Sequence, residues 1–570
     1  MEILDWIVLS TTLFFIVVYG ALKTKGSATV KDYLLDNNET PWFTVGISVM
    51  ATQASAITFL STPGQAYHDG MGFVQFYFGL PLAMIVIAYT FIPIYHKLKV
   101  FTAYEYLEQR FNVETRTLAS VLFLIQRGLG TGITIYAPSI ILSALLGWNL
   151  TMLNIIIGVL VIIYTVSGGT KAVNVTQKQQ MFVIMSGMFI TFFVILAHLP
   201  QDVDFSNVLH IAGANGKMDI LDFSYNPETR YTFWSGITGG FFLMLSYFGT
   251  DQSQVGRYLS GKSIKESQMG LIMNGILKVP MQFFILLTGV LVFVFFQFND
   301  APLHFNPINV EKVSSSSQKE AYHDLEKQLN QVNIDKKVVN QIYIEQLKHN
   351  EYDNPTLRKK MIALSLEEKE LRDDAKTLIS KADKSAETND KDYVFLYFIM
   401  NYLPKGLLGL LLAVIISAAM SSSASGLNSL AATTAIDLYK RNVPHKSDKH
   451  YVYTTQYFTL FWGIVAIGFA CVSSLFENLI QLVNIIGSIF YGTVLGIFLI
   501  GFYIKYIKGK AVFYGGIISQ TIVILIFLQY IFFESNESEK LGYLWLNLIG
   551  VVLTLGISFV LQQFFNKKEA

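Results

Sequence analysis

The sequence predicts an all-α polytopic membrane protein with about thirteen transmembrane helices. Hydrophobic residues make up 52% of the 570 residues and charged residues only 15%, whereas about a quarter of a soluble domain is charged. The apolar residues gather in runs of roughly 18 to 30, the length needed to cross a hydrocarbon core about 30 Å thick. Basic residues are concentrated in every second loop between these runs.

Each predicted span is an apolar run bounded by polar or turn-forming residues. In chain order the predicted spans are 5–22, 42–60, 71–95, 115–146, 150–167, 178–198, 231–252, 267–297, 393–422, 452–474, 479–504, 511–532 and 541–564. Because the number of spans is odd, the two ends of the chain should lie on opposite sides of the membrane.

The loops assign an orientation to these spans. Lys23 and Lys31 follow the first span, and Lys440 and Lys449 follow the ninth, whereas loops such as "FEN" and "ESNESEK" are neutral or acidic. Short loops rich in Lys and Arg stay in the cytoplasm. We therefore expect a multi-pass protein of the cell membrane (plasma or inner), with the N-terminus outside and the C-terminus cytoplasmic.

One long polar segment interrupts the pattern. Residues 299–392 contain nearly equal numbers of acidic and basic residues and helix-forming stretches such as "EAYHDLEKQLNQV". The orientation assigned to the spans places this segment outside the membrane, as a helical insert. The simpler interpretation is a solvent-exposed insert with no role in transport. The alternative is that the insert docks a partner. The expected divisions are 1–298 (a first peripheral helix and core helices one to seven), 299–392 (the insert), 393–504 (core helices eight to ten) and 505–570 (two C-terminal helices).

Two spans have the composition of interrupted helices, which membranes tolerate only where the backbone lines a cavity or is buried in protein. Residues 42–60 carry polar Thr52, Gln53 and Ser55 at mid-depth, and residues 231–252 carry four glycines. These spans are five apart. That spacing fits two inverted five-helix repeats, each beginning with a broken helix that places binding sites at the bilayer midplane.

The stretch "SAAMSSSASGLNS" at 417–429 has an unusual density of hydroxyls and small residues for a helix in lipid. A hard monovalent cation needs several oxygen ligands but no full set of carboxylates. Small residues also let two helices approach closely without any ligand. Composition alone leaves both interpretations open.

Three segments resemble the signatures of the sodium/solute symporter family, whose members share the leucine-transporter fold. They are "PWFTVGISVMATQASAITFLSTPGQAY", "GTDQSQVGRYL" and "SAAMSSSASGLNSLAATTAIDLYK". The resemblance runs through about residues 1–300 and 393–510. "YEYLEQRFN" and "TGITIYAPSIIL" are most similar to the branch of monocarboxylate, multivitamin and iodide carriers.

The resemblance implies a sodium site between the first and eighth core helices and a solute site beside it. The implied sodium ligands are the carbonyls of Ala51, Ala54 and Ala418 and the hydroxyls of Ser421 and Ser422. The candidate solute-binding residues are Gln53, Thr58, Tyr77, Arg127, Tyr247 and Lys278. Sodium, the only cofactor expected, would be transported with the solute.

Two departures from the family pattern limit what can be carried over. Some members bind a second sodium with an aspartate where this chain has Gln177, so one sodium per cycle is expected. The family's galactose carrier binds sugar hydroxyls with a glutamine and a glutamate where this chain has Thr58 and Tyr77. That argues against a galactose-like site, although Tyr247 matches an aromatic gate residue of the same carrier.

Two mid-membrane cations bear on the charge of the solute, since ionisable residues within a membrane are functional candidates by default. Arg127 and Lys278 facing a cavity would favour an organic anion; alternatively each is paired internally, for instance with Asp251. A sugar or polyol is the second candidate. The galactose carrier has a lysine matching Lys278, so that residue discriminates little.

Other classes of function are less well supported. No His, Asp and Glu cluster at catalytic spacing lies within the spans, and "GGT" at Gly168 lacks a P-loop, so neither an enzyme nor an ATP-driven pump is expected. The net charge of +1 suggests no nucleic-acid partner, and the single Cys471 excludes disulfides. A solute sensor on a transporter fold and a sodium leak remain alternatives. The expected partners are the solute, sodium and the lipid bilayer.

Overall fold

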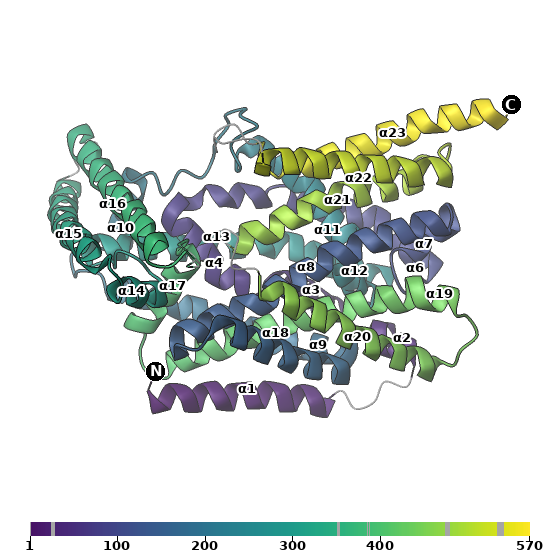
Figure 1. Ribbon diagram of the computed structural model, residues 1–570, viewed down its shortest axis with the longest axis horizontal. Helices are drawn as coiled ribbons and strands as arrows, with labels where there is room; N and C mark the ends of the chain where they lie inside the picture. Colours follow the sequence, from purple (N-terminus) through teal and green to yellow (C-terminus); the bar gives the residue numbers. More distant parts are fainter. Residues whose placement is uncertain are drawn as a thin grey trace.

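A computed structural model describes residues 2–23, 29–349, 354–384, 386, 388–472, 479–532 and 541–569. The fold is helical, and most helices of the body run along the long axis of the molecule (Figure 1). Within the described residues, eight helices are long and apolar enough to cross a membrane. The all-α polytopic prediction is confirmed at this level.

The first interrupted helix lies where the sequence predicts it. Helix α3 (Trp42–Gln53) and helix α4 (Ala56–Asp69) are separated by Ala54 and Ser55. Ser55 has an extended backbone, with φ of −82° and ψ of 176°. The extended residue ends one helix and starts the next, so the span continues to residue 69 rather than 60.

The second interruption lies at Asp251, not at the glycines. A π-helical turn (η4, Ser235–Gly240) leads into α11 (Phe241–Thr250), and α12 (Gln252–Leu259) follows the extended Asp251. Asp251 caps α12, because its carboxylate accepts the amide of Ser253 at 2.9 Å. The small glycines serve packing instead: a Cβ at Gly236 would lie 2.0 Å from a backbone oxygen of the neighbouring segment.

The hydroxyl-rich helix starts and ends later than predicted. Helix α17 (Lys391–Tyr402) is separate, and α18 (Leu407–Thr433) continues into a π-helical turn, η5 (Thr434–Tyr439). Gly406, with φ of 85°, divides α17 from α18. Ser421 and Ser422 therefore lie near the middle of this span, not near its inner end as we expected.

The predicted loop between the fifth and sixth spans is wrong, because residues 168–177 are helical and α9 runs unbroken from Leu150 to Ala197. The third span is made of four short helical segments. These are η2 (Gly70–Tyr77), α5 (Leu80–Val86), η3 (Ile87–Phe91) and α6 (Ile92–Leu98).

The remaining long helices agree with the predicted spans to within a few residues at most ends. They are α1 (Ile3–Lys23), α8 (Val113–Leu146), α13 (Ile264–Phe298), α20 (Asp448–Ala470), α21 (Leu479–Tyr503), α22 (Gly509–Phe532) and α23 (Trp545–Glu569). Short helices outside them are α2 (Val30–Leu35), η1 (Asp36–Asn38), α7 (Glu105–Arg110), α10 (Phe205–Ala214) and α19 (Lys440–Asn442). Side-chain caps fix several starts; Asn112, for example, accepts the amide of Thr115 before α8.

Residues 299–392 contain α14 (Pro307–Ser314), α15 (Lys319–Lys348) and α16 (Pro355–Ala382). These helices lie at the end of the body that also carries the N-terminus, whereas the C-terminus lies at the opposite end (Figure 1). Glu368 of α16 pairs with Lys336 of α15 at 2.8 Å and with Arg372 at 3.0 Å, all three buried. Lys336 also donates to the carbonyl of Phe296, which ties the insert to α13.

Candidate functional site

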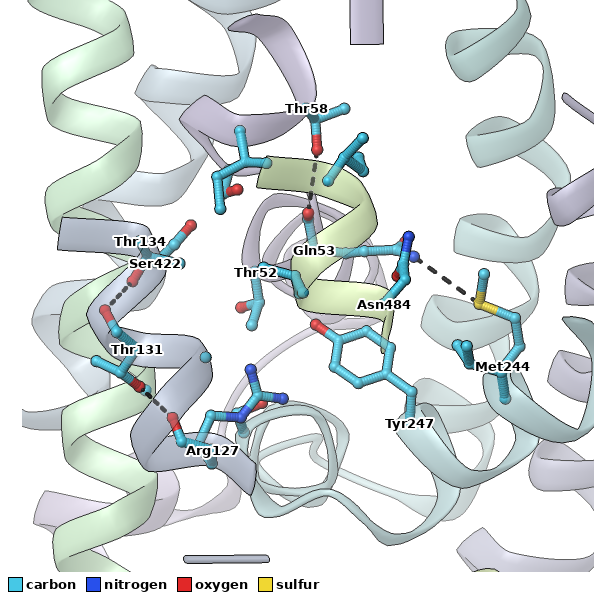
Figure 2. Close-up of a pocket in the computed structure, with 18 of the residues that line it drawn as sticks. Thr52, Gln53, Thr58, Arg127, Thr131, Thr134, Met244, Tyr247, Ser422 and Asn484 are labelled. Carbon is cyan, nitrogen blue, oxygen red and sulfur yellow. Dashed lines mark hydrogen bonds between the residues drawn. The ribbon is translucent and has the colours of Figure 1, made fainter. Parts of the chain in front are cut away.

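A cavity of about 100 Å³ lies beside the break between α3 and α4 (Figure 2). Its walls come from five parts of the chain: the broken first helix with η2, α8, α11 with the start of α12, α18, and α21. The polar residues that line it are Thr52, Gln53, Ser55, Thr58, Tyr77, Arg127, Thr131, Thr134, Tyr247, Ser253, Ser422, Asn484 and Tyr491.

The break releases the two carbonyls on this segment that the resemblance implies as sodium ligands. In a continuous helix, Ala51 would accept from the amide of Ser55, and Ala54 from that of Thr58. The amide of Ser55 instead donates to Gln53 at 3.0 Å, and that of Thr58 donates to Ser55 at 3.0 Å. Both alanines are buried, so their carbonyls are available for a ligand other than solvent.

The hydroxyls of Ser421 and Ser422 lie on α18, which contacts both α3 and α4. Each Oγ is buried, and neither has a hydrogen-bond partner. Buried hydroxyls are ordinarily hydrogen-bonded, and the neighbouring Ser423 follows that rule by pairing with Thr134 at 2.8 Å. Two adjacent buried hydroxyls thus lack partners, and hydroxyl and carbonyl oxygens are ligands of the type that hard cations take.

Arg127 is the one charged residue among those that line the cavity. Its Nη2 forms a salt bridge with Asp251 at the second helix break. Its Nε is buried without a hydrogen-bond partner, and its guanidinium lies 5.5 Å from the ring centre of Tyr247. Nη2 is therefore paired with a carboxylate, whereas Nε, on the same edge of the guanidinium, still offers a donor.

The other solute candidates divide into two groups. Gln53, Thr58, Tyr77 and Tyr247 all line the cavity, and the side-chain oxygen of Gln53 is buried without a partner. In Figure 2 the side chain of Gln53 extends toward Met244, whose sulfur lies 3.9 Å from its amide nitrogen, and Tyr247 is drawn below it. Lys278 does not line this cavity: it is fully buried in α13, and its Nζ has no hydrogen-bond partner.

Several cavity residues escaped the sequence reasoning although a signal was present. Thr131 and Thr134 stand four and seven residues after Arg127 and so share its face of α8. Asn484 and Tyr491 are similarly seven residues apart in α21, where a polar pair in an apolar run marks a cavity-facing stripe. A search for polar residues at helical spacing would have found both pairs.

Gln177 lies in a buried polar cluster next to the break. Its amide nitrogen donates to Thr52 at 3.1 Å, and its oxygen lies 2.7 Å from the hydroxyl of Ser48. Asn174 lies at the same distance from Ser48 and accepts from Arg257 at 3.2 Å. The cluster joins α3, α9 and α12 through neutral acceptors and one guanidinium.

Comparison with known families gives a match over most of the chain. The model of the "Sodium:solute symporter family" matches residues 33–333 and 375–519. The interval between the two matched ranges falls within the polar insert.

Curated relatives include the human sodium-coupled monocarboxylate transporter 1, which is 27% identical over 489 residues, 86% of this chain and 67% of that protein. The rabbit sodium-dependent multivitamin transporter is also 27% identical, over 88% of this chain and 66% of the relative. The human sodium/iodide cotransporter is 30% identical over 49% of this chain and 43% of its own length.

Among solved structures, the chain resembles a sodium-coupled sialic acid symporter in a substrate-bound, outward-open state. The TM-score is 0.74 with 22% sequence identity, and the match covers 99% of this chain and 98% of the other. At this identity the likeness establishes the common fold.

Proposed function

The chain belongs to the sodium:solute symporter family and is a sodium-coupled solute symporter; we propose that its solute is a small organic anion, imported with one sodium per cycle by alternating access. Sodium binds the carbonyls of Ala51, Ala54 and Ala418 and the hydroxyls of Ser421 and Ser422. The solute binds in the adjoining cavity. Closure of the broken helix around both ions precedes their release into the cytoplasm.

The observation that carries the anion proposal is the unpaired Nε of Arg127 in the same cavity as Ser422. A buried guanidinium N–H without an acceptor is costly, and a carboxylate oxygen is a strong, charge-assisted acceptor for it. The polar walls formed by Gln53, Tyr247 and Thr131 would hold the remainder of a small solute. The named activities of the curated relatives, which include monocarboxylate transport, support the same class.

One sodium follows from the chemistry of the Gln177 cluster. Its hydrogen bonds already engage the side chains of Thr52 and Ser48, and the amide carries no charge. The nearby guanidinium of Arg257 would also repel a second cation. These features support a single sodium beside α18.

A neutral sugar or polyol is the second candidate, favoured by the salt bridge between Arg127 and Asp251. That pair leaves the cavity with no net charge from its walls. The amides of Gln53 and Asn484, with several threonines, are suitable partners for hydroxyl groups.

The two candidates differ in how transport responds to voltage. One sodium moving down 100 mV contributes about 2.3 kcal/mol, and a tenfold sodium gradient adds about 1.4 kcal/mol. Together they support roughly 500-fold accumulation of a neutral solute. A monoanion carried with one sodium moves no net charge, so only the sodium gradient drives it, to about tenfold.

The discriminating experiment measures uptake into proteoliposomes at a fixed sodium gradient, with a potassium–valinomycin potential set to zero or to 100 mV, negative inside. Uptake of a monocarboxylate that does not change with the potential supports the organic-anion proposal. Accumulation of a polyol, with no carboxylate uptake and a strong dependence on the potential, replaces it with the second candidate.

We also propose the detailed architecture on which this mechanism depends. The breaks at Ala54–Ser55 and at Asp251 open the first and sixth core helices of two inverted five-helix repeats within the thirteen predicted spans, and the continuous α9 supplies the fourth and fifth core helices. Support comes from the two breaks, since residues next to each of them line the same cavity. The N-terminus and the insert face outward and the C-terminus faces the cytoplasm of a cell membrane, as the basic loops indicate.

A further inference from the structure

The carboxylate of Asp251 belongs to neither the proposed solute ligands nor the proposed sodium ligands, yet it lies at the second helix break beside the cavity. Its side chain is buried, and donors engage both of its oxygens. Oδ1 accepts the amide and the hydroxyl of Ser253 at 2.9 and 2.7 Å. Oδ2 accepts the hydroxyl of Tyr491 at 3.1 Å and forms the salt bridge with Arg127.

This arrangement fixes the charge of the cavity. Arg127 is the one charged lining residue, and the carboxylate of Asp251 offsets it. Tyr491, itself held by Gln126 at 3.1 Å, keeps the carboxylate in place. The walls contribute zero net charge before either ion binds.

The proposed sodium ligands are near enough to Arg127 for the net charge of the cavity walls to affect sodium binding. Ser423, next to Ser422, bonds to Thr134, which stands seven residues after Arg127 on α8. At 1.5 Å per residue this spacing corresponds to about 10 Å. A solute anion on Arg127 and a sodium at Ser422 would therefore share one cavity, in buried surroundings where an unbalanced charge is costly.

We propose that Asp251 couples the two ions: by neutralising Arg127 it makes the cavity accept sodium and a monoanion as a pair, and disfavours either ion alone. The inference rests on the proposed organic-anion function. Sodium without solute leaves a buried charge of +1, and solute without sodium leaves −1. The pair restores neutrality, so each ion raises the affinity for the other by the same factor, as linkage requires.

The test uses purified full-length protein with radiolabelled sodium and radiolabelled propionate, measuring the affinity for each with and without the other. Asp251→Asn should leave a cavity of +1. Propionate should then bind without sodium, and sodium affinity should fall about tenfold, the effect of one charge at about 10 Å in an effective dielectric near 20.

Arg127→Gln is the reciprocal variant and keeps the inference testable if Asp251→Asn does not fold. It should bind sodium about tenfold more tightly without solute and lose propionate binding. The double variant Arg127→Gln/Asp251→Asn should return sodium affinity to the wild-type range. Ser429→Ala, on α18 outside the cavity lining, removes a hydrogen bond but no charge, and should keep the sodium dependence of propionate binding.

The outcomes separate the two proposals. If wild-type protein binds no carboxylate in sodium, the organic-anion function fails and the coupling role fails with it. If wild-type binding of propionate depends on sodium and Asp251→Asn keeps the same dependence, only the role of Asp251 is overturned. Unchanged sodium affinity in Arg127→Gln would overturn it equally.

Discussion

Removing either hydroxyl of the proposed sodium site should have opposite effects in the absence and presence of sodium. The Oγ atoms of Ser421 and Ser422 are buried without hydrogen-bond partners. An orphaned buried hydroxyl destabilises a fold by about 1–3 kcal/mol. Ser421→Ala and Ser422→Ala should therefore leave the sodium-free protein as stable as the wild type, or more stable.

In sodium the same variants should lose stabilisation. A hydrogen bond to a charged group, the nearest analogue of one neutral ligand to sodium, contributes about 1.5–3 kcal/mol, which corresponds to roughly 10- to 160-fold in affinity. Sodium at 100 times its dissociation constant stabilises the wild type by about 2.7 kcal/mol. A tenfold weaker site leaves about 1.4 kcal/mol, and a hundredfold weaker site about 0.4 kcal/mol.

The assay is thermal unfolding of the purified protein during a sodium titration, with choline maintaining the ionic strength. Ser429→Ala is the matched control on the same helix, because the Ser429 hydroxyl already donates to Gly426 at 2.8 Å. It should keep the whole sodium increment. If Ser421→Ala and Ser422→Ala lower stability in choline and keep the increment, the hydroxyls serve packing and the cation site is refuted.

Three further predictions concern other parts of the chain. Gln177→Asp should steepen the sodium dependence of uptake toward two ions, and an unchanged single-site titration would contradict that role. Burial alone would raise the pKa of Glu368, but Lys336 and Arg372 lower it to about 2 from 4.5, so its stabilisation is complete above pH 4.5 and lost as pH falls through 2. Glu368→Gln should cost roughly 3–5 kcal/mol at neutral pH, measured by unfolding, and remove that acid dependence. Gly64→Ala should impair folding or expression, because its Cβ would lie 1.9 Å from a backbone oxygen at the start of α17; expression at the wild-type level would show that the two helices can separate.

The sequence predicts the broken helices well because their signal is local. Polar residues at mid-depth in 42–60 precede the break at Ala54–Ser55, and the carbonyls it releases belong to two of the predicted ligands. The position of the second break was harder to predict from the sequence. Asp251 ends α11 by an extended backbone and a cap on Ser253, whereas the glycines that suggested a break lie in a helical turn and in α11.

Tertiary pairing explains most of what the sequence could not predict. Asp251 determines whether the charge of Arg127 is neutralised. The two residues are 124 positions apart in the sequence, and only the fold brings them together. Lys278 has the same sequence signal as Arg127 but lies outside the lining of the cavity. Asn484 lines it from α21, which the resemblance did not identify as part of the site.

The end of α17 shows a different limit. Residues 393–422 read as one apolar run, yet Gly406 at φ of 85° divides α17 from α18. Averaged hydropathy passes over the short turn at Pro404, Lys405 and Gly406, which ends one helix before the next begins. The consequence is functional, because the later start of α18 places Ser421 and Ser422 near the middle of the span.

Sodium-driven uptake of a small carboxylate is the most direct test of the account. Proteoliposomes with an inward sodium gradient would be screened with labelled short monocarboxylates and polyols, with potassium replacing sodium as the reference and Ser422→Ala as the variant. The account predicts that a carboxylate accumulates about tenfold only in the sodium gradient, and that accumulation is lost in the variant. Equal uptake in potassium, or a sodium flux that needs no solute, would contradict it.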